Sequence, residues 1–139
     1  MTQEEKSLSL QDLSARLSYG VKVQVEYDAE EFGKTVEIDE ITMIDKYGEE
    51  ILLYHASEYF SIEELKPYLR PMSSMTKEER NNLRAYCRTQ EGIIYDIGVS
   101  GAINSPAIID WLNANHFDYR GLIEKGLAIE APEGMYEKK

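Results

Sequence analysis

Strict alternation of apolar and polar side chains from Val21 to Tyr27 is the feature that most constrains this fold. Valine or tyrosine occupies every second position, and Lys22, Gln24 and Glu26 stand between them. Successive side chains of a β-strand point to opposite faces, so the pattern predicts a strand with one buried and one solvated face. A helix would need apolar residues with a period of about 3.6, which is not the spacing found here. A sheet is therefore expected to begin at this point of the chain.

A second strand is expected from Thr35 to about Asp45, after the polar loop Asp28–Lys34. Its apolar residues change phase at Asp39-Glu40, where a β-bulge would let both halves of the strand face the core. The residues concerned are Val36 and Ile38 before the change, and Ile41 and Met43 after it. Tyr47-Gly48 marks the next turn, and Ile51–Tyr54 predicts a third, more continuously apolar strand.

The next segment combines one helical turn with two prolines. Ser61 is the expected N-cap of a turn that reaches Leu65, and the proline-containing run Lys66–Pro71 is expected to be extended, at a sheet edge. Together, the strands and the turn in residues 20–72 resemble the pattern of the Src-homology-type small β-barrel. Such barrels often bind a peptide or a nucleic acid in an aromatic groove between loops. Fold analogy alone does not assign that function to this chain.

An amphipathic helix is expected within residues 1–18, before the strands. Leu10, Leu13 and Leu17 recur at helical spacing, and Ser9 is the expected N-cap. Asp12 would then lie near the positively polarised end of the helix. Tyr19-Gly20 ends the helix, because glycine readily adopts the left-handed conformation that follows many helices.

Thr76 and Glu79 have the spacing of a capping box, which predicts that a helix begins after the linker Ser73–Met75 and ends at Gly92. Three arginines line one face of this helix, at positions 80, 84 and 88. They could bind phosphates or an acidic partner. Packing against the acidic strands of the same chain is the preferred interpretation, because opposite charges attract.

Two further helices are expected, in Ser105–Phe117, where Pro106 suits the first turn, and in Asp118–Gly126, where Asp118 is the cap. Ala128–Ala131 predicts one more strand, and Ile93–Asn104 receives no assignment. The expected fold class is therefore α+β, with a small antiparallel Src-homology-like β-barrel followed by a three-helix C-terminal part. The expected division is an N-terminal helix in residues 1–18, the small β-barrel in residues 19–72 and a helical C-terminal subdomain in residues 73–139.

The net charge of −11 is concentrated in one segment of the chain. Glu26–Glu64 contains 13 acidic residues against two basic ones, Lys34 and Lys46, and the rest of the chain is neutral. Such a segment repels phosphate backbones, so non-specific binding of nucleic acid is not expected. A solvated acidic face is the preferred interpretation. A docking surface for a basic partner, or a mimic of nucleic acid, is the alternative.

Composition predicts a folded, soluble protein of the cytoplasm. The 139 residues are 42% hydrophobic and 29% charged, which suits one compact unit and argues against wholesale disorder. No stretch reaches the ~18 apolar residues of a membrane span, and the acidic N-terminus is unlike a secretory signal. The single cysteine, Cys87, cannot form an internal disulfide and is interpreted as a buried structural thiol. The oligomeric state is left open.

Motifs for catalysis and cofactor binding are absent from the sequence. It has no phosphate-binding glycine loop, no nucleophile elbow and no histidine or cysteine pair at metal-ligand spacing. We therefore expect no cofactor, no metal and no catalytic residue. His116 and Asp118 could form an acid–base pair, but helix caps are the preferred interpretation of both.

Candidate residues for binding a partner or ligand gather near Arg120, which falls in the first turn of an expected helix. A cation there is electrostatically unfavourable unless a carboxylate or phosphate accompanies it. Binding of an external anion is not the preferred interpretation. We prefer that Arg120 pairs with Asp110 or Asp118 of the same chain and that Trp111, the only tryptophan, is buried. Tyrosine is common at interfaces. The candidates are Trp111, His116, Asp118, Tyr119, Arg120, Tyr54 and Tyr68.

Two blocks of sequence, KPYLRPMSSMT at Lys66–Thr76 and DWLNANHFDYRGLIEKGLAIEAPEGMY at Asp110–Tyr136, resemble short uncharacterised proteins of phages, prophages and mobile elements of gut Bacteroidota. The resemblance covers the last two-thirds of the chain, and the barrel region only loosely. It implies a cytoplasmic accessory protein of a mobile element and carries over no catalytic or binding residue. The expected function is a non-enzymatic protein-interaction module. The alternative is a small-ligand or nucleotide-binding protein, or a minor enzyme, with a pocket near His116–Arg120.

Overall fold

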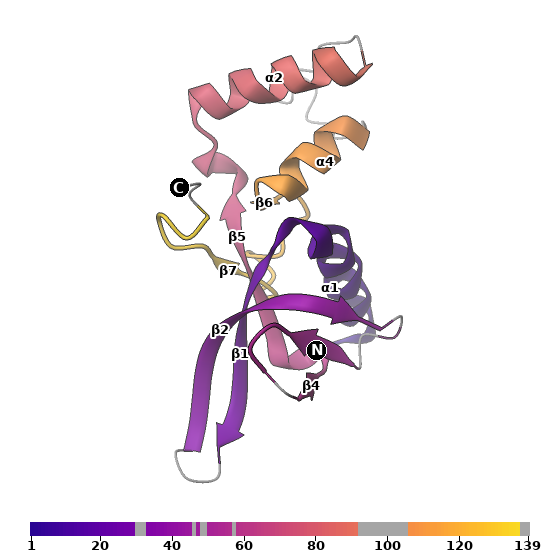
Figure 1. Ribbon diagram of the computed structural model, residues 1–139, viewed down its shortest axis with the longest axis vertical. Coiled ribbons are helices and arrows are strands. Elements are labelled where there is room, and N and C mark those ends of the chain that lie inside the picture. Colours follow the sequence, from indigo (N-terminus) through magenta and orange to yellow (C-terminus); the bar gives the residue numbers. More distant parts are fainter. Residues whose placement is uncertain (30–32, 46, 48–49, 57, 92–105, 137–139) are drawn as a thin grey trace.

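The computed structural model describes residues 1–29, 33–45, 47, 50–56, 58–91 and 106–136. Within them the protein is α+β, as expected, with one mixed sheet and three α-helices. Figure 1 shows α1 beside the strands, and α2 and α4 stacked at one end of the molecule. Some predictions fall outside the described part, namely those for Gly48, Gly92, Ile93–Asn104 and Ser105 and for the side chains of Cys87 and Arg88.

The strands β1 (Lys22–Ala29) and β2 (Gly33–Ile44) form a long antiparallel hairpin. β1 confirms the strand predicted from the alternation, since Val21, Val23 and Val25 are all buried. These valines join the main core, where Leu13 of the N-terminal helix also packs. Alternation therefore fixed both the type of this element and the face that it buries.

The hairpin extends beyond the rest of the sheet. β1 pairs with β5 only over Val23–Val25, and β2 pairs with β3 only from Ile41 onward. The remainder, Glu26–Ala29 of β1 with Gly33–Val36 of β2, is a two-stranded ribbon, and we call this ribbon together with Glu37 and Ile38 the arm. Figure 1 shows it leaving the body of the protein at the end opposite to α2. In the described part of the chain, both outer edges of the arm lack a paired strand.

The irregularity in β2 is displaced from its predicted position. The register of β2 against β3 (Ile51–Leu53) shifts between Ile41 and Met43, not at Asp39-Glu40. Because the strand stays regular through Asp39, Val36 and Ile38 remain on the outer face, where they are 52% and 54% exposed. The expectation that both halves of β2 face the core is therefore wrong.

The strand β5 (Leu65–Pro71) lies inside the sheet, so its expected place at an edge is wrong. It pairs antiparallel with β1 and in parallel with the short strands β6 (Phe117–Asp118) and β7 (Ile129–Glu130). The prolines of β5 do not prevent this pairing, because Arg70 and Leu69 form backbone hydrogen bonds beside the short parallel ladders. The N–H of Arg70 donates to His116 at 2.7 Å, and the carbonyl of Leu69 accepts from Ala131 at 2.8 Å. β7 confirms the strand predicted at Ala128–Ala131.

The strand order is β4-β3-β2-β1-β5-β6, with β4 (Tyr59–Phe60) at one end. Among the described residues β4 pairs only with β3, so the sheet does not close into a barrel. The strand pairings within residues 20–72 are antiparallel, as expected, and the parallel pairs come from β6 and β7. The turn η2 (Ile62–Glu64) has the predicted cap, since Ser61 and Glu64 form a capping box.

The helix α1 (Gln3–Arg16) begins earlier than expected. Its N-cap is Thr2, whose hydroxyl accepts the N–H of Glu5 while the Glu5 carboxylate accepts the N–H of Thr2. Ser9 and Asp12 are consequently buried within the helix, so the predicted cap at Ser9 is wrong. The helix gives way to one more turn, η1 (Leu17–Tyr19), and Gly20 follows with φ 72°. That left-handed position confirms the predicted stop.

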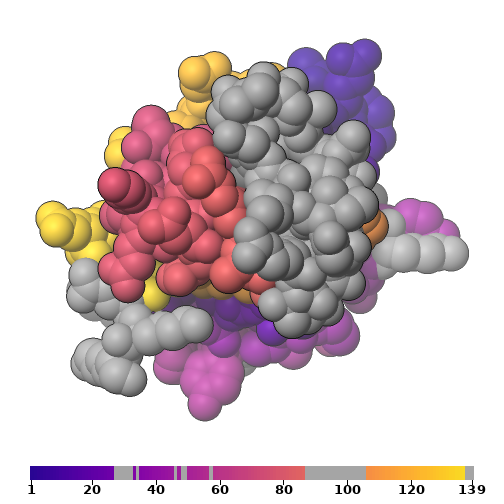
Figure 2. Space-filling model, turned by 90° about the horizontal axis from the view of Figure 1, so that it is seen from above, coloured from indigo at the N-terminus to yellow at the C-terminus, as the bar shows by residue number. Residues whose placement is uncertain are grey.

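The helices α2 (Lys77–Glu91) and α4 (Pro106–Ala114) pack against each other around a second, smaller core. The buried residues of this core are Leu83, Ile108, Leu112 and Phe117. α2 forms the surface at one end of the molecule (Figure 2), whereas the acidic arm lies at the other end (Figure 1). The helix that carries Arg80 and Arg84 therefore does not pack against the acidic arm, contrary to the preferred interpretation of the arginine stripe, and the side chain of Arg88 lies outside the described part of the chain. The capping box of Thr76 and Glu79 is confirmed.

The helix expected over Asp118–Gly126 is replaced by successive turns. Gly121 has φ 74°, a left-handed conformation that a right-handed helix cannot contain. The predicted stop at Gly126 holds, with φ 75°. The next residue, Leu127, donates its N–H to Leu122 at 3.0 Å and is buried in the main core.

Candidate functional site

The segment from His116 to Arg120 joins α4 to the last turns, and its polar groups bind within the chain. The carboxylate of Asp118 is buried and accepts the backbone N–H groups of Leu122 and Ile123, at 2.9 and 3.0 Å. This is the capping role that the sequence favoured, although it stabilises a turn and not a helix. Asp118 therefore has a structural function.

His116 is buried, with a left-handed backbone at φ 63°. Its ring stacks on that of Tyr136, with centroids 3.6 Å apart and planes 15° from parallel. The pKa of His116 is lowered to about 4, first by burial and then by nearby cationic side chains, so the imidazole is neutral at pH 7. Within the described part of the chain its Nδ1 has no hydrogen-bond partner, so no acid–base pair with Asp118 forms.

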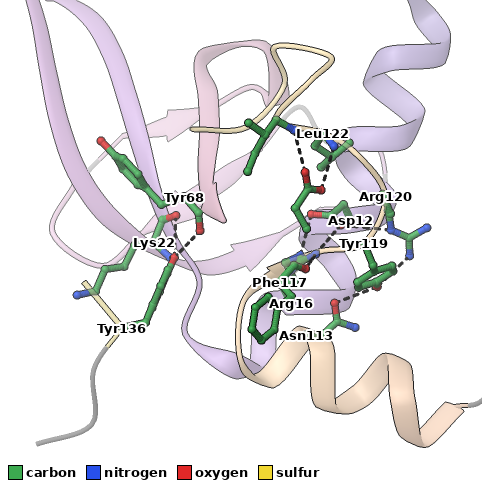
Figure 3. A network of polar contacts seen from close by, with 12 residues as sticks. Asp12, Arg16, Lys22, Tyr68, Asn113, Phe117, Tyr119, Arg120, Leu122 and Tyr136 are labelled. Carbon is green, nitrogen blue, oxygen red and sulfur yellow. Dashed lines mark hydrogen bonds and ion pairs between the residues drawn. The ribbon is translucent and has the colours of Figure 1, made fainter. Parts of the chain in front are cut away.

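Arg16 is fully buried and is neutralised inside the protein (Figure 3). Its Nε and Nη2 donate to the carboxylate of Asp12 at 2.9 and 3.2 Å. The same Nη2 donates to the backbone carbonyl of Phe117 at 2.7 Å. Sequence reasoning assigned Asp12 to a helix end and missed this pair, although an aspartate four residues before an arginine is a recognisable helical pair.

Arg120 joins the same network. Its Nε lies 3.2 Å from Oδ1 of Asp12, an ion pair without hydrogen-bond geometry, and its guanidinium lies 5.1 Å from the ring centroid of Tyr119. The partner is thus a residue of α1, not Asp110 or Asp118 as the sequence suggested. Tyr119 donates its hydroxyl hydrogen to Asn113 at 2.9 Å. The positive charge of Arg120 is thus already paired with a carboxylate of its own chain, although Nε of Arg120 and Nη1 of Arg16 have no hydrogen-bond partner among the described residues.

The aromatic candidates are divided between the interior and the surface. Trp111 is half-buried and stacks on Phe117, with centroids 5.7 Å apart. Tyr68 is 6% exposed, and its carbonyl accepts the hydroxyl hydrogen of Tyr136 at 2.8 Å (Figure 3). Tyr54, by contrast, is 69% exposed. The structure therefore does not bring the predicted candidates together into one patch.

One cleft of about 690 Å³ lies between the end of β5, the start of α2 and the C-terminal segment. Arg70 lines it, but its guanidinium donates to both carboxylate oxygens of Glu79, at 2.6 and 2.7 Å. The other charged residues that line it are Glu130 and Glu133. His116, Asp118 and Arg120 do not line it, so the cleft does not supply the pocket proposed for them.

A smaller cleft of about 370 Å³, here called the notch, lies at the base of the arm. It is lined by Lys22, Ile38, Asp39, Glu40, Tyr54 and His55. The Asp39 carboxylate is 8% exposed and accepts the backbone N–H groups of Glu40 and His55. It also lies 3.1 Å from Nδ1 of His55, whose ring projects into solvent. Asp39 thus holds the imidazole at the rim of the notch.

The outer face of the hairpin continues from the notch onto the arm. Ile38 and Val36 are aligned with Gln24 and Glu26 across the ladder. The two aliphatic side chains are about half exposed, and Ile38 reaches the notch beside Tyr54. Sequence reasoning missed this surface because it assigned both residues to the core. The signal available was their unbroken alternation with Thr35 and Glu37.

In the part of the chain that the structure describes, no group of three or more His, Cys, Asp or Glu residues could hold a metal ion. No described helix has both the length and the apolar character needed to cross a membrane. The chain matches no known protein-family model, no curated protein and no solved structure. The site must therefore be judged from its own geometry.

Proposed function

We propose that this chain is a non-enzymatic protein-interaction module that binds a partner protein through the outer face of its arm. The observation that carries the proposal is the exposed apolar surface of Val36, Ile38 and Tyr54, which are 52%, 54% and 69% exposed. Contiguous exposed apolar side chains with a polar rim are typical of protein-binding sites. The proposed setting is an accessory protein of a phage or mobile element, which the resemblance in Lys66–Thr76 and Asp110–Tyr136 implies.

The shape of the arm supports the proposal. The outer edges of the arm pair with no described strand, and such edges readily accept a further strand from a partner. Its outer face carries the aliphatic pair opposite Gln24 and Glu26. We propose that residues 20–72 keep the strand arrangement of the Src-homology-type small barrel in an open form, without closure between β4 and β5. It is supported by the strand order β4-β3-β2-β1-β5 and by the helical turn before β5.

The alternative site at His116–Arg120 has less support. Asp118 binds two backbone N–H groups, Arg120 pairs with Asp12, and His116 stacks on Tyr136. A ligand there would have to compete with interactions that stabilise the fold. We therefore base the proposed function on the arm.

The test compares three forms of the full chain as affinity baits in an element-bearing host. The double variant Val36→Thr with Ile38→Thr removes aliphatic surface but keeps β-branched side chains, so the strand should persist. Tyr59→Thr, which also changes an exposed residue but in β4, is the control. Circular dichroism and thermal unfolding verify that all three forms are folded.

We expect the double variant to lose a protein that the unaltered chain and the control both retain. That protein, once purified, should bind the unaltered chain directly and bind the double variant at least tenfold more weakly, the loss expected when an anchoring residue is removed. Equal capture of every protein by all three forms would overturn the proposal.

A further inference from the structure

The notch beside the arm has three kinds of wall. Ile38 supplies an apolar side, the ring of Tyr54 an exposed aromatic face, and Glu40 a carboxylate. The rings of Tyr54 and His55 meet edge to face, with centroids 4.7 Å apart, so the histidine supports the tyrosine ring from one side. An apolar wall, a π-face and a carboxylate together suit the flat cation of an arginine side chain.

The charges around the notch favour a cation. Lys22 is the only lysine or arginine among the residues that line it, and its ammonium is directed elsewhere, donating to the carbonyl of Met135 at 3.2 Å. The same ammonium lies 5.9 Å from the ring centroid of Tyr136. The stem of Lys22 therefore lines the notch while its charge is engaged at the C-terminal segment.

The two carboxylates of the notch differ in availability. Asp39 is buried and occupied by the backbone and ring of His55. Glu40 is partly exposed and forms no ion pair with any described residue. An incoming cation would therefore meet the carboxylate of Glu40, while Asp39 holds the ring of His55 at the rim of the notch. The surrounding segment from Glu26 to Glu64 has a net charge of −11, which attracts a basic partner.

We infer that the notch binds an arginine side chain from an extended basic segment of the partner, with the guanidinium against Tyr54 and its N–H groups on Glu40. This inference rests on the proposed function and specifies the chemistry of the partner. Arginine fits better than lysine because its planar guanidinium stacks on an aromatic ring and still donates two hydrogen bonds to a carboxylate. A second copy of this chain is disfavoured, because the two acidic segments would repel each other.

The probe is a short synthetic peptide in which valine and threonine alternate around one central arginine. Peptides with citrulline or lysine at the centre are its controls, since citrulline keeps the shape of arginine without the charge. Binding is followed by amide chemical shifts of the full-length protein. We expect shifts centred on Glu40, Tyr54 and His55, and an affinity for the arginine peptide about fivefold to tenfold above that for the citrulline peptide.

Variants at exposed positions separate the notch from general attraction to an acidic protein. Glu40→Gln should abolish the preference for arginine, whereas Glu124→Gln, an equal change of charge at an exposed turn, should preserve it. Tyr54→Leu should weaken the arginine peptide severalfold, and Tyr54→Phe should not, because phenylalanine keeps the π-face.

Equal binding of the arginine and citrulline peptides would overturn the inference, as would equal effects of Glu40→Gln and Glu124→Gln. If that happens while the double variant at Val36 and Ile38 still loses its partner, the arm remains a docking surface and only its partner chemistry is wrong. If the notch selects arginine but the double variant captures every partner normally, the proposed function fails instead.

Discussion

The imidazole of His116 stacks on the phenol ring of Tyr136, 3.6 Å away, and this contact holds the C-terminal segment against the sheet. The hydroxyl of Tyr136 accepts the N–H of Lys22 at 2.9 Å and donates to the carbonyl of Tyr68 at 2.8 Å. One side chain thus connects the C-terminal segment, β1 and β5. The stability of the sheet should depend on this contact and on the protonation of its histidine.

Acidification should destabilise the protein through His116. Its pKa is lowered from 6.5 to about 4 in the folded state, so the unfolded chain binds this proton more readily. The contribution of neutral His116 is complete above pH 6.5 and is lost as the pH falls toward 4, with a size on the order of 3 kcal/mol. His116→Asn, which tolerates the positive φ, should show a flatter decline in the free energy of unfolding over this range. The free energy of unfolding is measured by urea titration at each pH. The same pH dependence for His116→Asn and the unaltered protein would contradict this role of His116.

Removing the carboxylate of Asp12 should be strongly destabilising. Asp12→Asn would leave the fully buried guanidinium of Arg16 without its counter-charge, at a cost of about 3–5 kcal/mol. Glu4→Gln, an exposed change in the same helix, should cost less than about 0.5 kcal/mol. Chemical denaturation at pH 7 measures both. A similar cost for the two variants would show that the buried pair contributes little.

Two adjacent glutamates in the first turn of α2 should respond very differently to the same change. Glu79 binds Arg70 with both oxygens and accepts the N–H of Thr76, whereas Glu78 is exposed. Glu79→Gln should cost about 1–3 kcal/mol and reduce the order of the helix start. Glu78→Gln should change the free energy of unfolding by only a few tenths of a kcal/mol.

The same carboxylate predicts a pH effect. Hydrogen bonds from Arg70 lower the pKa of Glu79 below its ordinary value of 4.5. The stabilising contribution of the ionised Glu79 carboxylate is complete above pH 4.5 and is lost as the pH falls below this value. Unfolding curves of Glu79→Gln should therefore change less than those of the unaltered protein below pH 4.5, and Glu78→Gln should follow the unaltered protein. Parallel curves for all three proteins would contradict this assignment.

Tyr136→Phe should cost about 1–2 kcal/mol, because it leaves the N–H of Lys22 and the carbonyl of Tyr68 without this partner. Burial raises the pKa of Tyr136 to about 12, so between pH 10 and 12 the unfolded state releases a proton that the folded state retains. Tyr136→Phe lacks this ionisable group, so its free energy of unfolding should fall less between pH 10 and 12 than that of the unaltered protein. Tyr54→Phe, at an exposed ring, is the control and should be nearly neutral. Equal stability losses for the two variants would contradict the role of the Tyr136 hydroxyl.

Local patterns predicted much of the fold. Alternation located β1, glycine located the stops at Gly20 and Gly126, and paired capping residues located the start of α2. Each of these signals acts within a few residues, where backbone sterics and local hydrogen bonds decide the conformation. Such predictions do not depend on how the rest of the chain is arranged.

The errors concern interactions that join distant segments. β5 is internal because β6 and β7, which follow it by many residues, pair with it, and no feature of Lys66–Pro71 reveals those partners. Arg120 pairs with Asp12 for the same reason. Val36 and Ile38 were placed in the core because apolar residues are usually buried, but burial depends on where the adjacent strands end. For the same reason the structure does not bring the candidate residues together, and Tyr54 is the candidate that lies at the proposed surface.

The buried guanidinium of Arg16 sets an order of events during synthesis. Its acceptor at Phe117 lies 101 residues further along the chain, so it is made roughly 5–20 s later at ~5–20 residues per second. Until Phe117 has been synthesised, Arg16 of α1 cannot form its hydrogen bond to that carbonyl. The hairpin, whose partners are close in sequence, can form much earlier. We therefore expect the arm to be presented on the ribosome before the body that carries it is complete.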